Sequence, residues 1–171
     1  VAQELNAPII SADSRQFYKE MSIGTAKPTN EERALAEHHF IDTHSIQDLT
    51  LTSAGFMKSA RQKIDQLVQD GAKNIIVTGG SGMFIDAMID GLHPSPSDST
   101  VRTNLHEEWK QKGMEPLLKE LALKDAESFA NIDTHNPMRV LRTLEILRVS
   151  GKTLGEIRKV PKEKINYPMK R

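Results

Sequence analysis

The chain has 171 residues, 37% hydrophobic and 27% charged, which is typical of a globular protein with one core and an attached module. It contains no cysteine, which excludes disulfides, thiolate catalysis and zinc–thiolate sites, and no apolar run is long enough for a membrane helix. The net charge is zero, but residues 139–171 hold ten Lys or Arg and three Glu, which indicates either a surface for phosphate contacts or a solvated basic tail.

The first 95 residues are predicted to form an α/β core that binds nucleotide or diphosphate. Residues 1–7 have the pattern of the last turns of a helix, and Ile9 and Ile10 follow as a buried parallel strand that ends at polar residues. Ligands collect at the carboxyl edge of such a sheet. Asp13 lies just beyond this strand, so it is a candidate proton acceptor, although an Asp there can also cap a turn.

The next stretch predicts a loop over residues 21–30, a short helix from about Glu31 to His38, and a longer helix that starts at Thr52 and ends near Gly71. The pair His38–His39 lacks further ligands at a recognisable spacing, so a packing role is favoured and no metal ligand is assigned. The longer helix places five residues on its buried face: Phe56, Ala60, Ile64, Leu67 and Val68.

A second buried strand, residues 74–78, runs into a glycine turn before another helix. In a parallel sheet this turn shares an edge with Asp13, and the amides and dipole of the following helix favour a phosphate. We therefore predict diphosphate binding by Gly79, Gly80 and Ser81, although the glycines alone indicate no more than a tight turn.

Residues 91–99 have the composition of a hinge, and residues 96–158 are predicted to form an α-helical module inserted on or docked over the core. Its last helix has Asn136 as N-cap and Pro137 in the first turn, and it stops at Gly151. Arg139 and Arg142 project from one face of this helix, which fits phosphate recognition or an ordinary charged surface. Residues 159–171 are expected to be a basic tail.

Five motifs occur in an order and at a spacing that resemble the tRNA dimethylallyltransferase family, also called tRNA isopentenyltransferases. They are Asp13–Lys19, Ile23–Thr29, His38–Asp42, Gly79–Phe84 and Arg139–Glu145. The resemblance implies a P-loop NTPase-like parallel sheet flanked by helices, with an α-helical insertion. It also implies transfer of a dimethylallyl group from dimethylallyl diphosphate to N6 of the adenosine on the 3′ side of the tRNA anticodon, with Mg²⁺ as cofactor.

The resemblance also implies roles for residues. Asp13 is expected to be the general base, with Ser81 and Arg102 close to the diphosphate, while Ser14, Arg15 and Gln16 read the target base. Arg102 is also expected to contact the tRNA. The tRNA is expected to contact a second segment, which comprises Met138, Arg139, Val140, Leu141 and Arg142. Two positions depart from the usual family pattern: Ser81 replaces Thr, and Met138 replaces Gln.

The family has a Gly-rich phosphate-binding loop before the first helix, and the chain lacks it, so we expect a truncated chain that is inactive by itself. Residues 166–170 resemble the start of a further strand. The alternatives are an adenylate isopentenyltransferase acting on free nucleotide, a catalytically silent RNA-binding fragment, and a small nucleotide kinase. The protein is expected to be a cytoplasmic monomer that binds the tRNA anticodon arm and no membrane.

Overall fold

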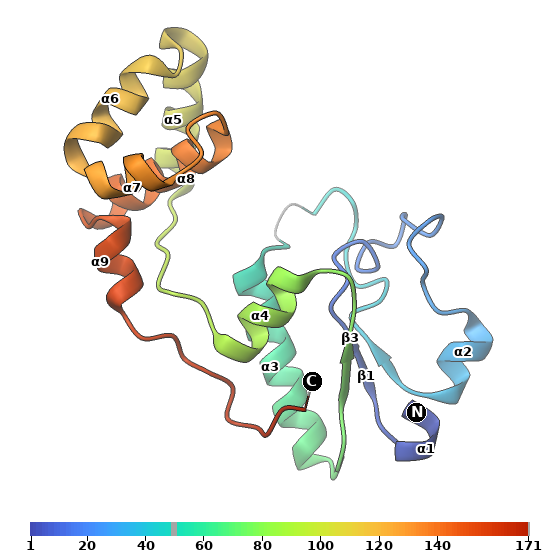
Figure 1. Ribbon diagram of the computed structural model, residues 1–171. Helices are drawn as coiled ribbons and strands as arrows, with labels where there is room; N and C mark the ends of the chain where they lie inside the picture. Colours follow the sequence, from blue (N-terminus) through green and yellow to red (C-terminus); the bar gives the residue numbers. More distant parts are fainter. Residues whose placement is uncertain (49–50, 171) are drawn as a thin grey trace. The chain divides into compact units, whose positions relative to one another are not determined.

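The computed structural model describes residues 1–48 and 51–170. The chain divides into two compact units, which are considered separately (Figure 1). The first, called the sheet unit, comprises Val1–Gly91 and Glu163–Arg171, and the second, called the helical unit, comprises Leu92–Lys162. Among the described residues, no helix combines the length and the apolar character needed to cross a membrane.

The sheet unit is built on three parallel strands, β1 (Ile9–Ser11), β2 (His38–His39) and β3 (Ile76–Thr78), in the order β2-β1-β3. The central strand β1 is the most deeply buried, as its β-branched apolar residues predict. Ser11 of β1 pairs with Thr78 of β3, so both strands end at the same edge. The parallel α/β sheet predicted from the sequence is confirmed.

The described residues of this unit form four helices: α1 (Ala2–Leu5), α2 (Asn30–Leu35), α3 (Ser53–Gln69) and α4 (Gly82–Asp90). The Thr52 side chain caps α3, and Gly71, with a φ of 95°, follows its end, as predicted. The prediction of one helix to His38 was wrong. The α2 helix begins at a capping box on Thr29, and the chain becomes extended at Ala36 and pairs with β1.

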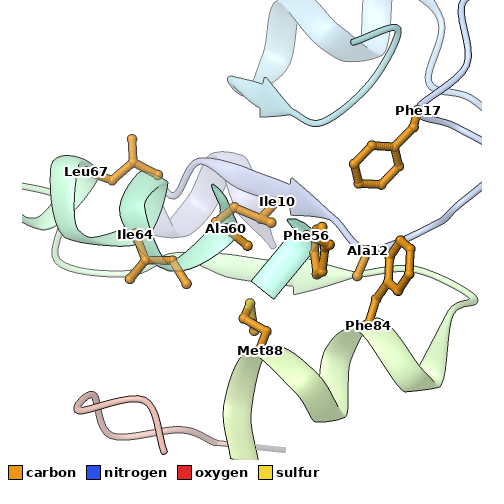
Figure 2. Packing of buried hydrophobic residues seen from close by; sticks show 9 residues of the cluster. All are labelled: Ile10, Ala12, Phe17, Phe56, Ala60, Ile64, Leu67, Phe84 and Met88. Carbon is orange, nitrogen blue, oxygen red and sulfur yellow. The ribbon is translucent and has the colours of Figure 1, made fainter. Parts of the chain in front are cut away.

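A hydrophobic core fills the space where α3 and α4 pack on the sheet. Figure 2 shows its buried members, which are Ile10, Ala12, Phe17, Phe56, Ala60, Ile64, Leu67, Phe84 and Met88. Phe56 and Phe84 stack with their ring centroids 4.8 Å apart, and Phe17 meets both rings edge-on. Phe17 therefore anchors the segment that follows β1. Val68, predicted to lie in the core, is 40% exposed, because it sits at the edge of the buried stripe of α3.

The helical unit contains α5 (Ser99–Lys112), α6 (Glu115–Lys124), α7 (Ala126–Asn131), α8 (Pro137–Ser150) and α9 (Leu154–Lys159). Helices α5, α6 and α8 share a core made of Leu105, Leu117, Leu121, Val140, Leu141, Leu144 and Leu147. Helix α8 has the predicted N-cap at Asn136 and the predicted end at Gly151. Helix α9, which begins at a capping box between Thr153 and Glu156, was not predicted from the sequence.

Two segments far apart in sequence meet where the sheet unit gives way to the helical unit. A Cβ atom on Gly91, which has a φ of 77°, would overlap the carbonyl oxygen of Glu163. Arg61 donates to the carbonyls of Met88 and Glu163 over 2.8 and 2.7 Å, and Ile165 N–H donates to Ile89 O over 2.9 Å. Glu163, Ile165 and Tyr167 therefore pack on the sheet unit.

Candidate functional site

The ends of β1 and β3 place Asp13 beside the glycine turn. Ala12 N–H donates to Thr78 O over 2.6 Å, and Ser81 N–H donates to Ala12 O over 3.1 Å. A Cβ atom on Gly79 would lie 2.6 Å from Asp13 N, so only glycine allows this close approach. A Cβ atom on Gly80 would lie 3.2 Å from Asp13 Oδ2, which places the carboxylate directly against the turn.

The Asp13 side chain is half-buried, and its two oxygens have different surroundings. Its Oδ1 accepts a hydrogen bond of 2.9 Å from Arg15 N–H, which is the turn-capping contact that Asp often makes. Its Oδ2 accepts no hydrogen bond from the residues that the structure describes and lies on the side of Gly80. Capping therefore orients the carboxylate and leaves one oxygen available for a proton.

Ser81 is tied to the residue that follows Asp13. Its hydroxyl accepts a hydrogen bond of 2.9 Å from Ser14 N–H and donates one of 3.0 Å to Ser14 Oγ. Ser81 is also the N-cap residue of α4, where its side chain makes no capping hydrogen bond. The glycine turn, the start of α4 and the Asp13 turn are thus linked by both backbone and side chains.

Of the residues predicted to read the target base, Gln16 is held by side-chain hydrogen bonds and Arg15 is not. The amide group of Gln16 accepts from Ser11 Oγ over 2.8 Å and donates to the carbonyls of Thr25 and Ala26 over 3.1 and 3.0 Å. This side chain holds the loop around Thr25 in place. Arg15, in contrast, is exposed, and its guanidinium makes no contact with the described residues that would restrain it.

An ion cluster not identified from the sequence holds the far side of the same loop. Lys27 Nζ donates to Tyr18 O over 2.6 Å and to Asp42 Oδ1 over 2.7 Å, and Arg33 donates to Asp42 Oδ2 over 2.6 Å. Burial alone would raise the pKa of Asp42, but the hydrogen bonds from Lys27 and Arg33 lower it below its ordinary value. Lys27 and Asp42 both occur in the motifs noted above, where no role was assigned to them.

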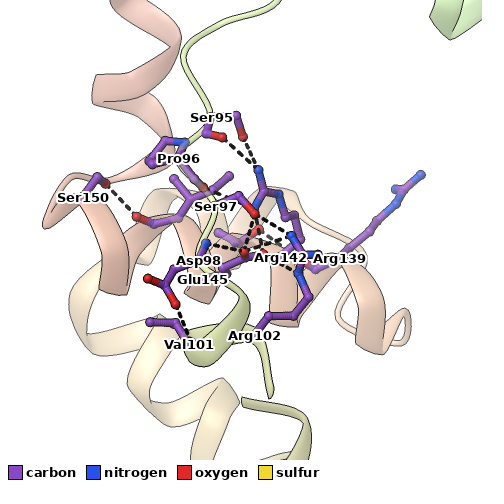
Figure 3. Close-up of polar contacts among 12 residues, drawn as sticks. Ser95, Pro96, Ser97, Asp98, Val101, Arg102, Arg139, Arg142, Glu145 and Ser150 are labelled. Atoms are coloured by element: carbon purple, nitrogen blue, oxygen red, sulfur yellow. Dashed lines mark hydrogen bonds and ion pairs between the residues drawn. The ribbon is translucent and has the colours of Figure 1, made fainter. Parts of the chain in front are cut away.

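Arg102 and Arg142 belong to the helical unit, where both pair with Glu145, as Figure 3 shows. The shortest contacts from the two arginines to Glu145 measure 3.0 and 2.7 Å. Arg142 also donates to Ser95 Oγ over 2.6 Å. Arg102, expected beside the diphosphate, is therefore in a different unit from Asp13 and Ser81.

The segment Met138–Arg142 divides into exposed and buried side chains. Met138 and Arg139 are exposed, and Figure 3 shows the Arg139 side chain extending away from the Glu145 cluster. Val140 and Leu141 are buried in the core of the helical unit. Arg139 is the member of the segment best placed to meet a phosphate.

Comparison with known proteins gives a consistent result. A family model described as IPP transferase matches residues 16–170. The tRNA dimethylallyltransferase of Chloroherpeton thalassium is 40% identical over 159 residues, which are 92% of this chain and 49% of that protein. The enzyme of the same name from Bifidobacterium longum subsp. infantis is 43% identical over 146 residues, which are 85% of this chain and 44% of that protein. The chain therefore spans about half the length of the curated relatives it matches.

The chain also resembles several solved structures, including the following two. The full-length tRNA isopentenylpyrophosphate transferase from Bacillus halodurans matches with 32% identity and a TM-score of 0.52, over 88% of this chain and 50% of that one. A eukaryotic dimethylallyltransferase described as acting on tRNA matches with 23% identity and a TM-score of 0.81, over 97% of this chain and 41% of that one. The second likeness concerns the fold alone.

Proposed function

Because the chain belongs to the IPP transferase family, we propose that the protein transfers a dimethylallyl group from dimethylallyl diphosphate to N6 of the adenosine on the 3′ side of a tRNA anticodon. The names of its relatives support this reaction, since those at about 40% identity are tRNA dimethylallyltransferases. The position of Asp13 against the glycine turn is the structural observation that carries the proposal.

In the proposed reaction, the adenosine N6 forms a bond to C1 of the allyl group while the bond from C1 to the diphosphate oxygen breaks. The exocyclic amine is a poor nucleophile, because its lone pair is delocalised into the purine ring. Asp13 Oδ2 accepts the amine proton, and the diphosphate leaves with the electron pair. The hydrogen bond from Arg15 N–H to Oδ1 keeps the carboxylate oriented for this step.

The glycine turn is the proposed contact for the diphosphate. The amide groups at the start of α4 and the positive end of its dipole favour an anion, and the Ser81 hydroxyl lies between that turn and Ser14. Mg²⁺ takes one or two carboxylates together with substrate phosphates. The described residues contain no group of three His, Asp or Glu suited to a metal. Bound together with the diphosphate, Mg²⁺ would neutralise the charge that develops on the leaving group.

The tRNA is proposed to contact both units. An anticodon-loop base can unstack and enter the site beside Asp13, where Ser14 and Arg15 are the available polar side chains. Arg102 and Arg139 in the helical unit are the proposed contacts for the RNA backbone. We infer no membrane partner, and we propose that the protein acts as a cytoplasmic monomer.

The substitution Asp13→Asn tests the proposal, because it preserves the side-chain shape and removes the base. We expect prenyl transfer to tRNA by the intact protein to fall at least about 10²-fold, with tRNA affinity within about 2-fold of wild type. Transfer of labelled dimethylallyl groups and filter binding of tRNA measure the two quantities. Asp70→Asn, at an exposed carboxylate after α3, is the matched control. Normal transfer by the Asp13 variant would refute the assignment.

A further inference from the structure

Glu145 is the most deeply buried carboxylate in the described part of the chain, with an exposed fraction of 2%. Its Oε1 accepts from Ser97 Oγ over 3.0 Å, from Asp98 N–H over 3.1 Å and from Arg102 over 3.0 Å. Its Oε2 faces Arg102 Nε at 3.3 Å and Arg142 Nη1 at 2.7 Å. Figure 3 shows these groups converging on one carboxylate.

Stability of the fold does not by itself explain why a carboxylate is buried in this cluster. A buried carboxylate must be desolvated, and well-packed apolar residues often give equal or greater stability in such places. Burial alone would raise the pKa of Glu145, but the hydrogen bonds from Arg142, Arg102 and Ser97 lower it, so the group stays ionised at neutral pH. Two arginines and one carboxylate leave a single positive charge at the cluster.

The cluster also holds the arginines in a defined orientation. Arg102 donates from Nε and Nη2 to Glu145, and from Nη2 also to Ser97. Arg142 pairs with Glu145 through Nη1, and its Nη1 and Nη2 donate to the carbonyls of residues 96 and 95. Within the described residues, Arg102 Nη1 and Arg142 Nε donate to no partner. The side chains lose much of their rotamer freedom before any ligand arrives, which lowers the entropic penalty of binding.

The fixed arginines line a hollow of the helical unit of about 310 Å³ between α5 and α8. Leu105 and Leu141 form its buried apolar floor, and His106 and Met138 contribute to its lining. A hollow that joins an apolar floor to oriented guanidinium groups suits a planar group attached to phosphate. RNA presents that combination at an unstacked nucleotide.

We propose that Glu145 is a positioning residue for RNA recognition. It holds the side chains of Arg102 and Arg142 at the hollow and neutralises one of their two positive charges. The helical unit therefore selects RNA by shape complementarity more than by charge. The inference rests on the proposed function, since it takes RNA as the substrate.

The test compares two RNAs with the intact protein: an anticodon stem–loop and a duplex of equal length and charge. Glu145→Gln keeps the shape of the side chain and removes its charge. We expect it to weaken stem–loop binding about 10-fold, while duplex binding stays equal or tightens up to about 3-fold because the cluster gains positive charge. The dependence of duplex affinity on salt concentration should steepen accordingly. A loss of packing alone would weaken binding of both RNAs together.

Two further variants keep the result interpretable. Glu120→Gln disturbs a comparable network on Arg148, away from the hollow, and should preserve the ratio of stem–loop to duplex affinity. Ser97→Ala removes the hydroxyl that joins Arg102 to Glu145 without changing any charge, and should lower that ratio about 2- to 3-fold. The Ser97 variant replaces the Glu145 variant in the test if the Glu145 variant does not fold.

The outcomes separate the two proposals. A wild-type ratio in both the Glu145 and Ser97 variants would overturn the positioning role, and so would an equal decrease for both RNAs. Wild-type protein that does not distinguish the stem–loop from the duplex would overturn the proposed function, and the positioning role with it.

Discussion

The Ser14 N–H donates a hydrogen bond of 2.9 Å to the Ser81 hydroxyl, which donates one of 3.0 Å back to Ser14 Oγ. The two residues are 67 positions apart, and the pair joins the ends of β1 and β3. Asp13 and the glycine turn are therefore held as one element, and movement of either strand end disturbs both.

Ser81→Ala removes both of these hydrogen bonds and leaves the Ser14 N–H unpaired. We expect the free energy of unfolding to fall by about 1–2 kcal/mol, and prenyl transfer to fall with it. Ser81→Thr retains the hydroxyl and should stay close to wild type. Urea unfolding and a transfer assay measure the effects, and an Ala variant equal to the Thr variant in both would contradict the prediction.

Gly79→Ala introduces a Cβ atom against the backbone of Ala12 and Asp13 at a φ of 150°. We expect a loss of roughly 1–3 kcal/mol or more in the free energy of unfolding, because backbone atoms cannot move aside easily. Gly82→Ala is the control, since nothing lies within 4 Å of its Cβ position in α4. Alanine there should stabilise by up to about 1 kcal/mol. Equal effects of the two changes in chemical denaturation would be incompatible with this packing.

Asp42→Asn removes the charge that pairs with Lys27 and Arg33. The folded-state pKa of Asp42 lies below the unfolded value, so its contribution is present at neutral pH and is lost as the pH falls through the folded-state pKa. We expect the variant to lose about 1–2 kcal/mol at pH 7, after allowance for partial exposure, and the difference from wild type to shrink as the pH falls below the ordinary Asp pKa towards the folded-state pKa. Urea unfolding across this pH range measures the difference. A difference independent of pH would rule out the ionic explanation, and exposed Glu4→Gln is the control.

Arg139→Ala and Arg142→Ala are predicted to differ in their effect on stability. Arg139 is exposed, so its loss should leave the thermal midpoint unchanged, weaken tRNA binding and reduce the salt slope by about one. Arg142 supports buried Glu145 and the carbonyls of residues 95–96, so its loss should destabilise by about 1–3 kcal/mol. Calorimetry and binding titrations at two salt concentrations distinguish the variants. The prediction fails if Arg139→Ala unfolds at a lower temperature than Arg142→Ala.

Local signals allowed much of the fold to be predicted. Ile9 and Ile10 indicated a buried strand, and Asn136, Pro137 and Gly151 marked the limits of α8, because caps and strand burial depend on neighbouring residues. The strand His38–His39 was missed for the opposite reason. Two polar residues carry no alternating pattern, and their extended form results from pairing with β1.

The site was predictable in its location and less so in its contacts. Asp13 and Gly79 reach the same edge because parallel strands end together, which strand order alone implies. Helical spacing allows the pair between Arg142 and Glu145, which are three residues apart on α8. In contrast, the hydrogen bonds from Gln16 to two loop carbonyls and the ion pair between Arg102 and Glu145 depend on tertiary distances that no spacing in the sequence encodes. The same holds for Lys27, whose partner Asp42 is supplied by a later turn.

The close approach of Gly91 to the backbone of Glu163 brings the two ends of residues 92–162 together. We therefore expect that a short linker in place of residues 92–162 would leave the sheet unit folded, because the linker would have no gap to span.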